Sequence, residues 1–119
     1  MYESGENYLE TILLLQQRQG FVRSVDVASE LGYSKASVSR AMGILKREGY
    51  VEMAGSGEIT LTELGRQKAL EIYERHHLIT EYLTRTLGID FEIASRDACR
   101  IEHVISTATF QRIKEIVQS

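Results

Sequence analysis

The chain has 119 residues, of which 43% are hydrophobic, and a net charge of −3 at pH 7. This length suits one compact domain or two very small ones. The single cysteine cannot form an intrachain disulfide, no run of roughly 18 apolar residues is present, and the acidic start lacks the basic segment of a signal peptide. We therefore expect a cytoplasmic protein with no membrane partner.

Charge is unevenly distributed along the chain. Residues 33–50 hold four basic side chains and one acidic side chain, whereas residues 1–17 hold three acidic side chains and no basic one. A locally basic segment can bind phosphate groups although the whole protein is acidic. The net charge therefore does not exclude nucleic acid as a partner.

Residues 5–17 carry apolar side chains at the spacing of an amphipathic helix. Residues 24–49 then have the pattern of a helix-turn-helix, with Ser24 and Ser34 as candidate N-caps and Gly32 between the two helices. Surface bases on a pair of helices are common in small domains, so this pattern alone leaves an ordinary helical pair open.

The second helix of the pair has the chemistry of a recognition helix for the DNA major groove. Val38, Met42 and Leu45 lie at i, i+4 and i+7 and are expected to face the core. Small and hydrogen-bonding side chains occupy the other face, where Arg40 can bind guanine in bidentate fashion. The predicted DNA-binding residues are Ser34, Lys35, Ala36, Ser37, Ser39, Arg40 and Lys46.

A β-hairpin is predicted directly after this helix, with strands at residues 50–53 and 58–61 and a glycine-rich tip at 54–57. A hairpin in this place is typical of the wing of a winged helix, which favours DNA binding over the ordinary helical pair. The tip holds no Lys or Arg, so we expect it to contribute little phosphate affinity.

The rest of the chain is predicted to be helical. A long helix capped by Thr60 or Thr62 extends to about Thr86, and shorter segments follow near residues 90–93 and 97–105. A last helix, starting at Ser106 or Thr107, completes the chain. These terminal helices are too short to bury their apolar faces alone, so we expect a second copy of the chain to cover them in a two-fold dimer.

The predicted fold is thus mainly α, with two domains. Residues 1–70 form an N-terminal winged helix-turn-helix DNA-binding domain with a small β-hairpin wing. Residues 71–119 form an all-helical dimerisation and metal-binding domain.

A thiol, a carboxylate and an imidazole fall within five consecutive positions, at Cys99, Glu102 and His103. In a helix they share one face, and such donors suit a divalent transition metal better than Ca²⁺ or Mg²⁺. A half-buried cysteine beside an unrelated Glu and His is the alternative. A catalytic Cys–His pair lacks an identifiable oxyanion hole or orienting group, so no enzyme is predicted.

The sequence Cys-Arg-Ile-Glu-His at residues 99–103 resembles the metal-binding helix of the diphtheria-toxin-repressor family. The resemblance continues in the first helix at 6–12, in the winged helix at 30–39 and 61–65, and in the linker helix at 75–78. It implies a dimeric transcriptional regulator, expected to be a repressor. Such a protein binds double-stranded operator DNA when Fe(II) or Mn(II) is present and controls metal homeostasis.

The resemblance also implies a ligand set drawn from two parts of the chain, with Fe(II) or Mn(II) as the physiological ion and Co(II), Ni(II) or Zn(II) able to bind in vitro. The implied metal ligands are Asn7, Glu10, His76, Cys99, Glu102 and His103. Asn7 is a departure, since a neutral amide stands at a family ligand position. Thr80 and Ser95 are departures at an ancillary site. A winged-helix regulator that senses oxidation at Cys99, or a small molecule, is the alternative.

Overall fold

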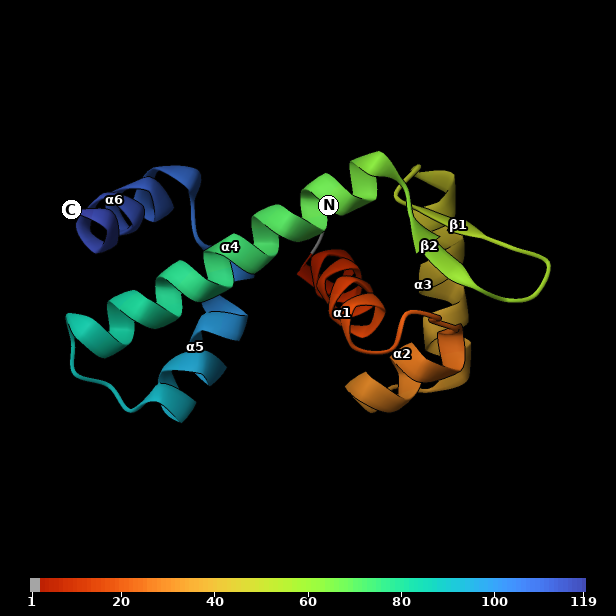
Figure 1. The fold of residues 1–119 in the computed structure, drawn as a ribbon, viewed down its shortest axis with the longest axis horizontal. Coiled ribbons are helices and arrows are strands. Elements are labelled where there is room, and N and C mark those ends of the chain that lie inside the picture. Colours follow the sequence, from red (N-terminus) through yellow and green to blue (C-terminus); the bar gives the residue numbers. More distant parts are fainter. Residues whose placement is uncertain (1–2) are drawn as a thin grey trace. The chain divides into compact units, whose positions relative to one another are not determined.

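In the computed structural model, the described residues run from 3 to 119. Met1 and Tyr2, which begin the acidic start considered above, lie outside them. The elements in chain order are α1 (Glu3–Gln19), α2 (Ser24–Leu31), α3 (Lys35–Arg47), β1 (Val51–Met53), β2 (Ile59–Leu61), α4 (Glu63–Arg85), α5 (Phe91–Val104) and α6 (Thr107–Gln118) (Figure 1). The mainly helical fold class with one small hairpin is confirmed.

The chain divides into two compact units, one ending at Leu70 and the other formed by Glu71–Ser119. In the first unit, α1 packs on α2 and β2, and α3 packs on α2 and β1. Its core is built from the apolar faces of these elements. The fully buried members are Leu9, Ile12, Leu13, Val22, Val27, Val38, Met42, Val51 and Ile59. Val38 and Met42 of the predicted inward face are among them, and Leu45 of that face is also buried, because the 3.6-residue period of the helix aligns these side chains.

Local hydrogen bonds define the two helices of the helix-turn-helix. Gly32 ends α2 in the left-handed conformation at φ 70°, and Ser34 caps α3 by accepting the Ser37 N–H at 3.1 Å. The prediction that Ser24 caps α2 is wrong. Arg23 occupies that position, and its backbone N–H donates to the Asp26 carboxylate at 2.8 Å. Because the carboxylate at the third helical position reaches back to this N–H, the helix begins one residue earlier than a serine cap would allow.

The wing is a two-stranded antiparallel hairpin in which Val51 lies opposite Leu61. The α4 helix follows directly and starts at Glu63, because the Thr62 hydroxyl accepts the Gly65 N–H at 3.0 Å. Gly65 itself lies against the backbone of Tyr50, so a Cβ there would overlap the Tyr50 carbonyl oxygen. Only glycine lets the start of α4 pack this closely on the wing.

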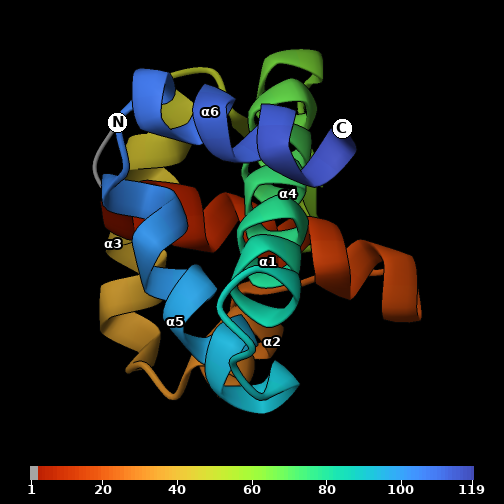
Figure 2. The same ribbon diagram turned by 90° about the vertical axis from the view of Figure 1, so that its left-hand side faces the viewer.

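The second unit packs α5 and α6 against the later part of α4 (Figure 2). Its core combines Leu78 and Ile79 of α4, Ala98 of α5, and Phe110 and Val117 of α6. The expectation of separate helical segments before and after residue 95 is wrong, since α5 is continuous. No glycine or proline falls within it, so nothing in its sequence interrupts the hydrogen-bond pattern.

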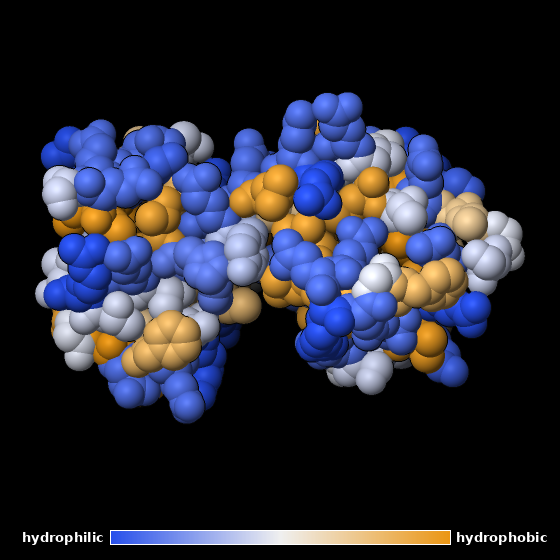
Figure 3. Space-filling view, viewed as in Figure 1, coloured by the Kyte–Doolittle hydropathy of each residue, from blue (hydrophilic) through white to orange (hydrophobic). Residues whose placement is uncertain are grey.

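Several large apolar side chains of the second unit are not buried. Phe91, Ile93, Val104 and Ile116 are 66%, 50%, 70% and 49% exposed. On the face drawn in Figure 3, apolar residues form patches within a mainly polar surface. Among residues 3–119, no helix combines the length and the apolar character that crossing a membrane requires.

Candidate metal centre and nucleic-acid interface

The second unit places a buried carboxylate between two imidazoles. Glu102 is fully buried on α5; its Oε2 lies 3.0 Å from Nδ1 of His76, and its Oε1 lies 3.3 Å from Nε2 of His103. A buried carboxylate is costly unless cations or hydrogen-bond donors face it. The two histidines, or a cation held among these side chains, therefore compensate the charge of Glu102.

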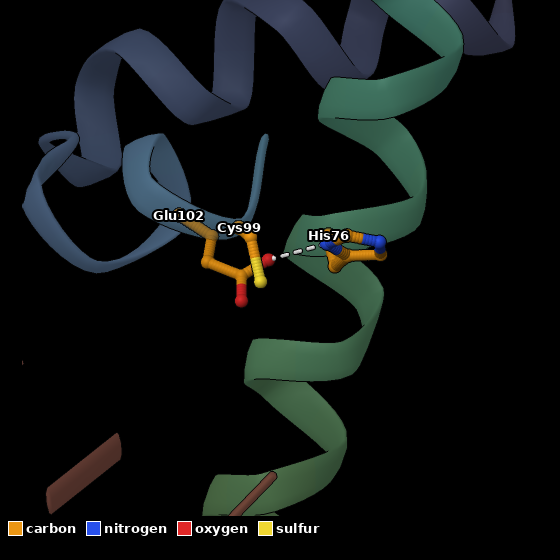
Figure 4. A group of neighbouring side chains, drawn as sticks. All are labelled: His76, Cys99 and Glu102. Atoms are coloured by element: carbon orange, nitrogen blue, oxygen red, sulfur yellow. Dashed lines mark hydrogen bonds and ion pairs between the residues drawn. The ribbon is translucent and has the colours of Figure 1, made fainter. Parts of the chain in front are cut away.

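Cys99 joins the same group. Each of His76, Cys99 and Glu102 offers a ligand atom, and these atoms all lie within 4.8 Å of one another. Figure 4 shows the thiol and the carboxylate side by side on α5, facing the ring of His76 on α4. Metal–ligand bonds of about 2.0–2.3 Å place the ligand atoms of one ion roughly 3–4.5 Å apart. The three side chains thus fit a transition-metal ion, and their nitrogen, sulfur and oxygen donors suit such an ion better than Ca²⁺ or Mg²⁺.

His76 is held at several points. Its Nε2 lies 3.3 Å from the hydroxyl of Ser95 on α5, and the Thr80 hydroxyl donates to its backbone carbonyl at 2.7 Å. Arg75 donates to the Glu102 backbone carbonyl at 3.3 Å, which adds a second link between α4 and α5. Of these contacts, only that with Ser95 reaches the ring itself, which lies between the two helices with its other nitrogen toward Glu102.

The neighbouring His77 is exposed and directed elsewhere. Its ring packs edge-on against Tyr73, with centroids 4.3 Å apart. Successive residues of a helix point about 100° apart, so two adjacent histidines do not serve one site. This agrees with the choice of His76 alone as a candidate ligand.

Within the second unit, the structure brings the ligand atoms of three of the six predicted ligands together, those of His76, Cys99 and Glu102, and His103 lies beside Glu102. Asn7 and Glu10 lie on α1 in the first unit, where Asn7 is partly buried and Glu10 is buried. Their role as ligands stays a prediction.

Ser95 was predicted only as a departure at a family ligand position, and not as a partner of His76. The residue stands four positions before Cys99 and seven before Glu102. This spacing places it on the same helix face and was the available indication.

The predicted recognition helix α3 presents its polar side to solvent. Exposed residues on it include Lys35, Ala36, Ser37, Ser39, Arg40 and Lys46. Ser34 is also exposed, but its hydroxyl is engaged in the cap and donates to Ser37 Oγ at 2.9 Å. With Arg47, this surface combines small side chains and four bases above a buried apolar face, which fits a major groove. The contacts with DNA themselves stay predictions.

Two family models match successive parts of the chain. The model described as "Iron dependent repressor, N-terminal DNA binding domain" matches residues 1–58, and the model described as "Iron dependent repressor, metal binding and dimerisation domain" matches residues 62–119. The chain belongs to the iron-dependent repressor family. This confirms the resemblance on which the ligand and DNA-binding predictions were based.

Several known proteins are similar over nearly the whole chain. An HTH-type transcriptional regulator of Methanocaldococcus jannaschii is 34% identical, with 96% of this chain and 92% of that protein covered. The iron-dependent repressor IdeR of Mycobacterium tuberculosis is 29% identical, with 100% of this chain and 52% of that protein covered. A solved manganese-dependent transcriptional repressor in complex with manganese has 29% identity and a TM-score of 0.88, with 96% of this chain and 52% of that chain covered. This chain therefore spans about half the length of two of these proteins and nearly all of the third.

Proposed function

We propose that this chain is a metal-dependent transcriptional regulator, expected to be a repressor. It binds operator DNA as a homodimer when Fe(II) or Mn(II) is bound, and so controls metal homeostasis. The observation that best supports the proposal is the buried Glu102 carboxylate between His76 and His103, with the Cys99 thiol within ligand distance. Enzymatic activity is not part of the proposal, and cytoplasm is the expected location.

A bound divalent ion would supply the positive charge that these side chains share. In the proposal, His76, Cys99, Glu102 and His103 hold the ion. The thiolate is softer than Mn(II) prefers, whereas the carboxylate and imidazole suit either ion, so Fe(II) is slightly favoured. The family resemblance adds Asn7 and Glu10 to the ligand set, so that ion binding would also act on α1.

The DNA-binding part of the proposal rests on the first unit. Residues 1–70 are proposed as the DNA-binding domain, with the exposed side of α3 in the major groove and the hairpin as its wing. Arg40 would bind base edges, and Lys46 would bind phosphate.

The dimer part of the proposal rests on the second unit, residues 71–119. A two-fold dimer presents two recognition helices to two half-sites of an operator. Exposed apolar side chains such as Phe91, Ile93 and Val104 are available to a second copy. Burying them would stabilise the association through the hydrophobic effect.

The central experiment is an anaerobic gel shift on DNA selected by the protein from a random library. We expect Fe(II) or Mn(II) to tighten binding relative to a chelator. Equal affinity in both conditions would contradict metal dependence. Cys99→Ala and His103→Ala should lose the response to metal while remaining dimeric by size-exclusion chromatography. A loss of the dimer in these variants would point to a structural role instead.

A second candidate function is oxidation sensing at Cys99, which its exposed position on α5 favours. Two measurements separate the candidates. Protein purified anaerobically should contain metal only if the metal proposal holds. Glu102→Gln should remove a metal response but leave a response of the Cys99 thiol to peroxide intact.

A further inference from the structure

Both ring nitrogens of His76 face a hydrogen-bonding group of α5. Nδ1 lies 3.0 Å from Glu102 Oε2, and Nε2 lies 3.3 Å from Ser95 Oγ. Ser95 is partly buried and precedes Cys99 by one helical turn. The ring is therefore held from two sides by one helix, with the candidate ligand Glu102 at one nitrogen and a neutral hydroxyl at the other.

Which ring nitrogen carries the proton follows from whether each neighbouring group donates or accepts a hydrogen bond. A neutral imidazole has one N–H donor and one lone pair, an ionised carboxylate only accepts, and a hydroxyl both donates and accepts. With no ion bound, a neutral ring that faces an ionised Glu102 must donate Nδ1–H to that carboxylate, so that Nε2 accepts from the Ser95 hydroxyl. If Nδ1 serves as a ligand, its lone pair must face the ion. The Nδ1 proton is then released to solvent, Nε2 takes up a proton from solvent, and the ring stays neutral.

Ser95 is suited to both arrangements because its O–H rotates. It donates to Nε2 in the first and accepts from Nε2–H in the second, without a change in the side-chain positions. Histidines that bind metal commonly donate their other N–H to an oxygen acceptor, which fixes the ring and raises its basicity. The Thr80 hydroxyl cannot replace Ser95, since it bonds to the backbone carbonyl of His76 rather than to the ring.

We propose that Ser95 is a positioning residue of the metal site, holding His76 through Nε2 so that Nδ1 is the ligand atom. This inference rests on the proposed metal-binding function and adds to it. Ser95 is not a ligand in this arrangement. Its contribution is the orientation and the proton position of His76.

The test uses Zn²⁺ as a diamagnetic probe on the full chain. Histidine labelled with ¹⁵N gives long-range ¹H–¹⁵N spectra in which each of the three rings reports its tautomer. His77→Gln and His76→Gln each remove one set of signals, which assigns all three rings. In the Zn²⁺-loaded protein we expect His76 to carry its proton on Nε2 and to bind through Nδ1. Calorimetry should show Zn²⁺ affinity about 10- to 100-fold weaker in Ser95→Ala. Ser95→Thr, which keeps the hydroxyl, should restore both the affinity and the spectrum.

Thr80→Val is the matched control, because it removes a hydroxyl that contacts His76 but not its ring. It should bind Zn²⁺ like the wild type. The role of Ser95 is overturned if Zn²⁺ binds Nε2 of His76, if Ser95→Ala keeps full affinity, or if Thr80→Val loses as much affinity as Ser95→Ala. Failure of the wild type to bind Zn²⁺ at all would overturn the metal site itself together with this inference. The first three outcomes would overturn only the role of Ser95.

Discussion

The two units of the chain differ in where the charged side chains of their candidate sites lie, at the surface in the first unit and in the interior in the second. In the first unit, the bases of α3 are exposed above a buried face of Val38, Met42 and Leu45. In the second unit, the carboxylate of Glu102 is buried and faces two imidazoles. A surface side chain can be removed with little effect on folding, whereas a buried ionisable group is coupled to stability. The comparison predicts that DNA binding and metal binding respond differently to substitution.

The largest effect is expected for Glu102→Gln. At a Co²⁺ concentration a hundred times its Kd, the wild type should gain about 2.7 kcal/mol in free energy of unfolding. The variant should gain nothing measurable, because an amide is a poor ligand in place of the buried carboxylate. Thermal unfolding with and without Co²⁺ measures both gains.

Glu115→Gln is the control for this experiment. Glu115 is exposed on α6 and pairs with Arg112 at 2.8 Å. Its variant should retain the full gain. A Co²⁺-dependent gain of wild-type size in Glu102→Gln would show that the buried site does not hold the ion.

Gly65→Ala should destabilise the first unit by about 1–3 kcal/mol, because the added methyl group overlaps the Tyr50 carbonyl oxygen. Gly43→Ala is the matched control, since nothing lies within 4 Å of the Cβ it would add. It should stabilise α3 by up to about 1 kcal/mol. Urea denaturation followed by circular dichroism compares the two. Equal stability of the two variants would show that the start of α4 can move away from the wing.

Arg40→Ala tests whether the exposed side of α3 binds bases. Specific affinity should fall by about 1–3 kcal/mol, with metal affinity and stability unchanged. Arg112→Ala, at an exposed position on α6, is the control and should bind DNA normally. Fluorescence anisotropy on the selected DNA measures the DNA affinity of both variants. A loss of metal binding in Arg40→Ala would contradict the separation of the two activities.

Lys46→Ala should weaken binding to all DNA sequences alike and lower the slope of log affinity against log salt by about 1, as expected for one lost phosphate contact. Lys114→Ala, which removes a partner of Glu74 on the second unit, should leave the slope unchanged. A sequence-dependent loss in Lys46→Ala would instead indicate a base contact.

The smallest effect is expected for the exposed pair that links α1 and α2. The Arg18 guanidinium donates to Glu30 and holds the pKa of that carboxyl below its ordinary value. Because the pKa is lowered on folding, the pair stabilises the protein above the unfolded pKa of Glu30 and ceases to do so as pH falls through the folded pKa. Glu30→Gln should therefore lower Tm slightly at neutral pH and not at all in acid. Thermal unfolding across pH checks this, and a larger effect in acid would contradict the assignment.

Prediction from sequence succeeded where the determinants are local. Gly32, Ser34 and the glycine-rich tip defined the helix-turn-helix and its wing, because their conformations are set within a few residues. The prediction that Ser24 caps α2 failed because the Asp26 carboxylate accepts the backbone N–H of Arg23, which makes Arg23 the N-cap. The prediction of two separate segments in place of α5 failed because apolar periodicity alone does not show that a helix continues.

The sequence by itself determined the helical faces, the wing, the family, and the shared face of Cys99, Glu102 and His103. These features repeat with the period of one helix and depend on neighbours one turn away. The tertiary structure decided that Glu102 is buried, that His76 meets it from 26 residues earlier, and that Ser95 faces the other side of the same ring. Those contacts depend on how α4 and α5 pack around Leu78, Ala98 and Phe110, and no local period encodes that packing.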